Sequence, residues 1–71
     1  MKIGDLVTFV DEGRYARWFF GRMAVVESIS INAAGEKYCR VKWLIPVKYH
    51  SGWADFSDFQ ANKFEVHNED R

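Results

Sequence analysis

The feature that most constrains the fold is the alternation of apolar and polar side chains in residues 37–45, KYCRVKWLI. Successive side chains of a β-strand point to opposite faces of the sheet, so a period of two predicts a strand with one buried face. The other face is half charged and is expected to meet solvent or a partner. The expected buried stripe consists of Cys39, Val41, Trp43 and Ile45.

Two earlier segments, residues 5–10 (DLVTFV) and residues 22–31 (RMAVVESISI), also favour strands because β-branched and apolar residues recur in them. In the second segment the alternation breaks after Val26, and a β-bulge near residues 27–28 would restore the inward face and bend the strand. Residues 32–36 (NAAGE) predict a hairpin turn. The expected inward side chains are Val7, Phe9, Ala24, Val26, Ile29 and Ile31.

The last third of the chain has a weaker pattern. We expect residues 46–56 to form a loop that leads into a short strand around Trp53, with Pro46 at the end of the preceding strand. A helical or 3-10 turn near residues 57–61 would begin at Ser57 as its N-cap. The three-residue spacing of Trp53, Phe56 and Phe59 suits one face of that turn, or alternatively a lip that contacts a peptide. The segment KFEVH predicts a final strand.

The length of 71 residues and the 48% hydrophobic content predict a single folded domain over residues 1–67, followed by a frayed polar tail at 68–71. The single cysteine, Cys39, has no partner for an intramolecular disulfide, which favours a reducing, cytoplasmic setting. The first ten residues carry Asp5 where a signal peptide would be apolar, and no run approaches about 18 apolar residues, so we expect neither export nor membrane insertion.

Charge is distributed unevenly although the formal net charge is zero. Residues 14–48 contain seven Lys and Arg residues against two acidic residues, and both ends of the chain are acidic. Dedicated nucleic-acid binders usually have a basic balance because phosphate neutralisation supplies much of their affinity. The overall balance therefore lowers the expectation of nucleic-acid binding without removing it.

Four stretches, KIGDLVTF, GRMAVVESI, YCRVKWLIP and a late Trp followed by FEV, form a pattern that resembles the small SH3-like barrels of the KOW and Tudor type. Within that group the chain is most similar to the short barrel proteins that bacteriophages encode, and the resemblance spans residues 2–66. It implies an all-β, five-stranded SH3-like barrel, in which short bent strands close around a small core. It also implies a phage accessory protein that acts in the host-cell cytoplasm.

In such a barrel, residues 11–21 would form the long loop between the first two strands, and this loop contains most of the aromatic run RYARWFFGR (14–22). Twelve aromatic residues are too many for so small an interior. We expect Phe19 and Phe20 to fold down and cap the core, and others to remain exposed beside arginines, as is usual for a recognition surface. The predicted protein-binding residues are Arg14, Tyr15, Arg17, Trp18, Trp53 and Phe56.

The predicted function is therefore a small non-enzymatic binding module whose partner is a host or phage protein. One alternative is a barrel that binds single-stranded RNA or DNA. Another is a homo-oligomeric structural protein, in which the same aromatic residues would form a homodimer seam. The residues predicted to contact phosphates in the first alternative are Arg14, Arg17, Arg22, Arg40 and Lys42.

Metal binding and catalysis have little support in the sequence. His50 and His67 are 17 residues apart, and no pair of ligands has the spacing of a zinc site. The acidic pairs Asp11/Glu12 and Asp55/Asp58 lie in expected turns without a nucleophile or a partner histidine. We expect no cofactor and no enzymatic activity.

Overall fold

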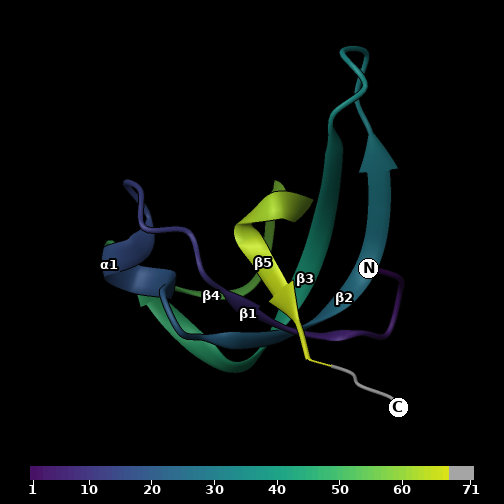
Figure 1. Cartoon of the computed structure of the whole chain (residues 1–71). Helices are drawn as coiled ribbons and strands as arrows, with labels where there is room; N and C mark the ends of the chain where they lie inside the picture. The colour runs from purple at the N-terminus through teal and green to yellow at the C-terminus, as the bar shows by residue number, and fades with distance from the viewer. Residues whose placement is uncertain (68–71) are drawn as a thin grey trace.

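Five antiparallel strands form one sheet in the order β4-β3-β2-β1-β5 in the computed structural model, which describes residues 1–67 (Figure 1). The predicted all-β fold class is confirmed, whereas the predicted tail at 68–71 lies outside the described residues. No helix among residues 1–67 is long and apolar enough to cross a membrane. The elements are β1 (Leu6–Phe9), α1 (Ala16–Phe19), β2 (Met23–Ile31), β3 (Lys37–Tyr49), β4 (Gly52–Gln60), the 3-10 turn η1 (Ala61–Lys63) and β5 (Phe64–Val66).

Strands β2 and β3 form the long hairpin that rises at the top right of Figure 1. The register of this pair shifts between Val26 and Ser28, so the predicted β-bulge is confirmed. The turn also matches the prediction. The side-chain oxygen of Asn32 accepts hydrogen bonds from the backbone N–H groups of Ala34 and Glu36, and Gly35 adopts a positive φ of 83°.

The sheet curls around a core that has Phe9 at its centre. The Phe9 ring lies 4.8 Å from the ring of Phe59 on β4 and 5.4 Å from that of Phe64 on β5, measured between centroids. Because β4 and β5 are the two edges of the sheet, these contacts show that the edges approach each other across the core. The buried apolar residues are Val7, Phe9, Phe19, Ala24, Val26, Cys39, Val41, Trp43, Val47 and Phe64.

Most of the predicted inward positions are buried, but Ile45 and Ile31 are 70% and 66% exposed, so the prediction was wrong for both. Ile45 lies where the β3·β4 register shifts between Lys42 and Val47. The strand bends there, and Val47 takes the next inward position in its place. Ile31 pairs with Lys37 in the last pair before the hairpin turn, beyond the strands that cover the core.

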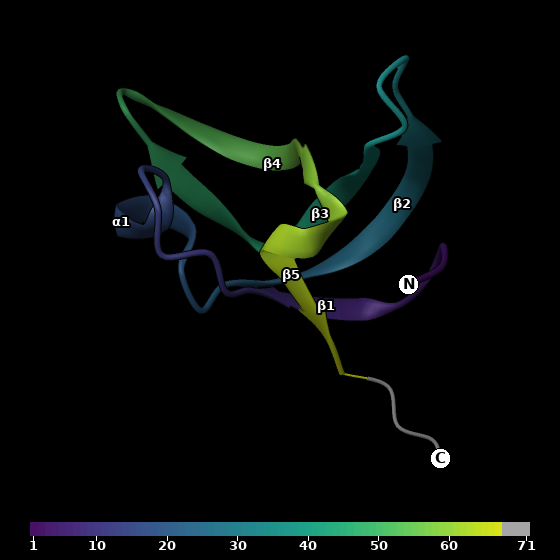
Figure 2. The same ribbon diagram turned by 45° about the horizontal axis from the view of Figure 1, so that its top comes forward.

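The region after residue 45 differs from the predicted loop and helical turn. β3 continues through Pro46 to Tyr49, and a tight turn at residues 50–51, in which His50 has a φ of 57°, leads directly into the nine-residue strand β4. Pro46 is tolerated because residues 44–46 have no ladder partner that requires its missing N–H. Figure 2 shows β4 leading through η1 into β5.

The 3-10 turn is therefore present but begins at Ala61, and Ser57 is a strand residue and not an N-cap. Trp53, Phe56 and Phe59 do not share a helical face. Trp53 and Phe56 are exposed, whereas Phe59 packs against the core.

Candidate protein-binding groove

A single helical turn, α1, interrupts the connection from β1 to β2. The end of this connection is fixed to β1, because Gly21 N–H donates to the carbonyl of Phe9 at 2.9 Å and Phe9 N–H donates to the carbonyl of Arg22 at 3.0 Å. Gly21 has a φ of 80°, which a residue with a side chain adopts only with strain. The aromatic run is thus an ordered segment that lies at the left of Figure 1.

Phe19 and Phe20 take opposite roles within this segment. Phe19 is 2% exposed and stacks on Trp43, with ring centroids 5.0 Å apart and an interplanar angle of 19°. Phe20 is 51% exposed, so the prediction that both side chains cap the core was wrong for Phe20. Phe20 follows the last residue of α1 and has non-helical backbone angles, φ −57° and ψ 130°, so its side chain does not continue the helical face that Phe19 buries.

Tyr15 and Trp18 are half-buried and pack against the core, which differs from the fully outward placement expected. The Trp18 ring is 4.8 Å from Tyr49, and the Tyr15 ring is 5.4 Å from Phe59, in both cases edge to face. Cationic groups lie over both rings. The guanidinium carbon of Arg14 is 5.7 Å from the Tyr15 centroid, and that of Arg17 is 5.0 Å from the Trp18 centroid.

A groove of about 410 Å³ opens between this aromatic segment and the β3–β4 hairpin. Of the predicted protein-binding residues, the groove brings together Tyr15 and Phe56. Trp18 and Trp53 do not line it. The lining residues are Tyr15, Phe19, Tyr49, Ala54, Phe56, Ser57, Asp58 and Phe59.

Sequence reasoning missed Tyr49 and Phe59 as groove residues. Tyr49 lies two positions after the buried Val47, so a continued strand would have placed it on the inward face, but the expected strand ended at residue 45. Phe59 had been assigned to a helical turn. Residues 56–59 (FSDF) do not alternate apolar with polar side chains, so periodicity gave no signal for a strand there.

Trp53 and Phe56 lie on the outer face of the β3–β4 pair, 68% and 48% exposed. Each stands opposite a lysine of β3 in the ladder: Trp53 pairs with Lys48 and Phe56 with Lys42. The ammonium nitrogens of these lysines are 6.0 Å and 5.9 Å from the ring centroids of their partners. Phe56 thus belongs both to this outer face and to the rim of the groove.

Some of the residues predicted to contact phosphates already interact with other side chains of the protein. Arg40 makes two parallel hydrogen bonds of 3.0 Å to the carboxylate of Asp58. The hydrogen bonds and opposite charge of this pair lower the pKa of Asp58 and raise that of Arg40. The guanidinium of Arg40 therefore already has an anionic partner, and Lys42 lies over Phe56.

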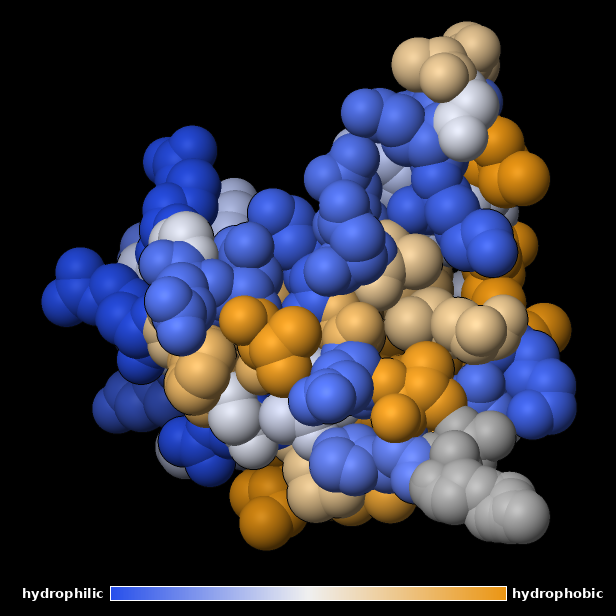
Figure 3. Space-filling view, viewed as in Figure 1, coloured by the Kyte–Doolittle hydropathy of each residue, from blue (hydrophilic) through white to orange (hydrophobic). Residues whose placement is uncertain are grey.

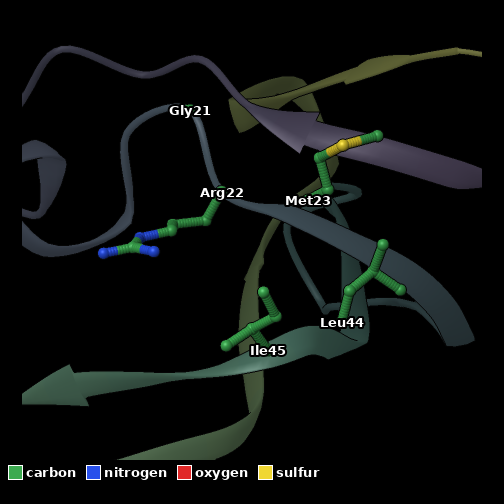
Figure 4. Close-up of a pocket in the computed structure, with 5 residues that line it drawn as sticks. All are labelled: Gly21, Arg22, Met23, Leu44 and Ile45. Atoms are coloured by element: carbon green, nitrogen blue, oxygen red, sulfur yellow. The ribbon is translucent and has the colours of Figure 1, made fainter.

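Arg22 belongs to another part of the surface. It lines a smaller pocket of about 210 Å³ with apolar residues from the start of β2 and the bend of β3 (Figure 4). In that view its side chain extends away from Met23 and Leu44. Figure 3 shows that the surface over α1 and the preceding loop is strongly hydrophilic, with apolar patches beside it.

No group of three or more His, Cys, Asp or Glu side chains within residues 1–67 is placed to hold a metal ion. His67 is hydrogen-bonded to Thr8, and the His50 ring contacts Trp18. Cys39 is buried, and burial raises the pKa of its thiol, with the negative charge of Asp58 acting in the same direction. The reactive thiolate of Cys39 is thus disfavoured.

Comparison of the chain with protein-family models, with curated proteins and with solved structures finds no match.

Proposed function

We propose that the protein is a small non-enzymatic binding module of the SH3-like type, a phage accessory protein that acts in the host-cell cytoplasm and holds a segment of a host or phage protein in the aromatic groove. The observation that carries this proposal is the groove itself, in which Tyr15 and Phe56 lie beside a floor that includes Phe19 and Phe59. The curled five-stranded sheet, with a 3-10 turn before its last strand, is in keeping with the proposed SH3-like type.

The groove suits an apolar or aromatic anchor because its floor is already ordered. Phe19 and Phe59 each contact Phe9 in the core, with ring centroids 5.9 Å and 4.8 Å apart. Side chains that are fixed before binding lose little conformational entropy when the partner arrives. Rigid aromatic pockets of this kind are where binding energy is usually concentrated.

Arg14 and Arg17 supply the charged part of the proposed surface. Arg14 lies over Tyr15, which forms part of the groove wall, and Arg17 lies over Trp18, the neighbouring ring of the α1 segment, which does not line the groove. An acidic group of the partner near this wall would form charge-assisted hydrogen bonds with them. Single-stranded nucleic acid is the less favoured ligand, because Arg40 is paired with Asp58 and Arg22 lines a different pocket.

The test begins with tagged protein expressed in a bacterial host, with and without nuclease treatment, and identification of what copurifies. Phe56→Ala removes a groove residue, and Trp53→Ala is the matched control because Trp53 is more exposed and lies outside the groove. We expect Phe56→Ala to reduce capture of a protein partner at least about tenfold, the scale of one binding hot spot, while Trp53→Ala retains it.

Two results would contradict the proposal. Capture that disappears with nuclease, with affinity that falls steeply as salt rises, would identify nucleic acid as the ligand. Equal capture by Phe56→Ala and the parent protein would show that the partner binds elsewhere. The melting temperature of each variant shows whether a lost interaction reflects unfolding.

A further inference from the structure

The strand β4 has an open hydrogen-bonding edge. It is an edge of the sheet and, within the described residues 1–67, pairs only with β3. Among residues 1–67, no backbone hydrogen bond outside the strand ladders involves residues 52–60. In an antiparallel pair, alternate residues of an edge strand direct their N–H and C=O groups away from the partner. Alternate residues of β4 therefore present a row of main-chain donors and acceptors that the described chain does not satisfy.

This edge lacks three of the usual protections against pairing, namely short length, lysine and proline. Natural edge strands are often short, or carry lysine or proline, which discourages the addition of another strand. The opposite edge, β5, has only three residues, but β4 has nine and contains neither lysine nor proline. Its sequence, GWADFSDFQ, is rich in aromatic residues. Figure 2 shows β4 at the top of the molecule, where β3 is its strand neighbour.

The aromatic groove runs beside the same strand. Five consecutive or near-consecutive residues of β4 line it together with Tyr49 of β3, and Tyr15 and Phe19 line it from the α1 segment. A chain in the groove would therefore lie next to the open edge. Extended backbone is the conformation that can use that edge along its length, since it repeats the spacing of donors and acceptors in β4.

The charges of β4 favour a partner segment over a second copy of the protein at this edge. β4 carries Asp55 and Asp58 and no Lys or Arg, and Asp58 is already paired with Arg40 of β3. Asp55 is exposed and makes no ion pair with another of residues 1–67, so two copies paired along β4 would bring two unpaired carboxylates to one seam. Like charges on adjacent strands destabilise pairing. A segment with a basic side chain would instead lie favourably beside Asp55, because oppositely charged neighbours on adjacent strands stabilise pairing.

We propose that β4 accepts an extended segment of a partner protein as a sixth strand, with apolar residues directed into the groove and a Lys or Arg residue beside Asp55. This inference rests on the proposed function in taking the groove as the binding site. It adds the backbone conformation of the partner and the pattern of its side chains.

The experiment uses a pool of random ten-residue peptides, selected against the parent protein. Asp55→Pro is the informative variant, because Asp55 has no partner in the β3·β4 ladder and its replacement leaves those pairs in place. Proline removes the N–H and obstructs an added strand. The matched control is Asp55→Ala, which removes the same carboxylate and keeps the N–H.

We expect selected peptides to alternate apolar with polar residues and to include a Lys or Arg residue. Asp55→Ala should bind them within a few-fold of the parent protein, and Asp55→Pro at least about tenfold more weakly, the scale of one or two lost main-chain hydrogen bonds. A bound peptide should slow amide hydrogen exchange at alternate residues of β4. That measurement uses the parent protein, so it decides the question even if Asp55→Pro fails to fold.

Peptides that bind Asp55→Pro and the parent equally, leave β4 exchange unchanged and lose binding with Phe56→Ala would overturn strand addition and leave the proposed function intact. Self-association abolished by Asp55→Pro would identify a second copy as the occupant, and would also overturn the inference. Failure to select any peptide, together with nuclease-sensitive capture, would count against both proposals.

Discussion

Phe19 and Phe20 provide a direct test of how the aromatic run is divided between core and surface. They are identical side chains at adjacent positions, yet Phe19 is 2% exposed and Phe20 is 51% exposed. Phe19 contacts four rings, those of Phe9, Trp43, Tyr49 and Phe59, at centroid distances from 5.0 to 5.9 Å. Replacing each with alanine in turn compares a core position with a surface position in the same segment.

The two variants are expected to differ strongly in their free energy of unfolding. Truncation of a buried phenylalanine to alanine lowers the free energy of unfolding by about 3–5 kcal/mol, since burial is lost and a cavity remains. Exposed substitutions usually change it by less than about 0.5 kcal/mol. A chain of 71 residues has a total stability of about 4–11 kcal/mol, so Phe19→Ala removes a large part of it.

Urea denaturation followed by tryptophan fluorescence measures both free energies, and calorimetry gives the melting temperatures. Phe19→Ala should lower the melting temperature by more than about 12 °C, because each kcal/mol corresponds to about 4–8 °C in a domain of this size. Phe20→Ala should move it by only a few degrees. Equal losses for the two variants would refute the assignment of Phe19 to the core and Phe20 to the surface.

Three further predictions follow from individual groups. Hydrogen bonds from the Lys2 side chain and backbone N–H hold the pKa of Asp5 below its ordinary value of 3.8, so its stabilisation is complete above that value and is lost as the pH falls through the lower folded pKa. Urea denaturation at pH 3 and pH 6 should show a smaller decrease for Asp5→Asn than for the parent protein. The thiol of Cys39 should react with an aromatic disulfide reagent only as fast as the protein opens, and at the rate of a free thiol in denaturant. Ser57→Ala removes the acceptor of the 2.9 Å hydrogen bond from the Trp43 ring N–H and should lower the free energy of unfolding by about 1–3 kcal/mol, while Ser57→Thr keeps the hydroxyl and loses less.

The alternation of side chains predicted the first half of the fold well. Strands around Val7, Val26 and Val41 each bury one face against the same core, and a period of two persists wherever that condition holds. The β-bulge after Val26 was also predictable, because one extra residue is needed to keep the apolar side chains before and after it on the same face of the sheet. These are local consequences of a sheet with one buried face.

The prediction for the second half of the fold was wrong because the register shifts between β3 and β4. Between Lys42 and Val47 the strand gains residues that have no partner in β4, which exposes Ile45 and accommodates Pro46. Because of the shift, Trp53 and Phe56 share the outer face of β4 although they are three positions apart. The same spacing in a sequence is typical of a helical turn. A shift of this kind depends on how far the sheet must bend around its core, which no short stretch of sequence records.

The groove could not be predicted as a unit for a related reason. Tyr15 and Phe56 are 41 residues apart and meet only because the sheet curls and the α1 segment is fixed to β1 through Phe9 and Gly21. Composition indicated that some aromatic residues must remain exposed, and this is the case for Phe20, Trp53 and Phe56. Which exposed residues share one surface is determined by the three-dimensional path of the chain.

The groove also limits which substitutions can report on binding. Phe19 and Phe59 form its floor and are at the same time part of the core packing around Phe9, so replacing either changes stability and binding together. The residues that can separate the two effects lie at the rim, where Phe56 is largely free of the core. The backbone edge of β4 is the other separable element, because its outward groups contribute nothing to the ladder with β3. A loss of binding caused by Phe56→Ala or Asp55→Pro without a change in melting temperature would therefore assign recognition to the rim and the edge, and leave the aromatic floor with its role in folding.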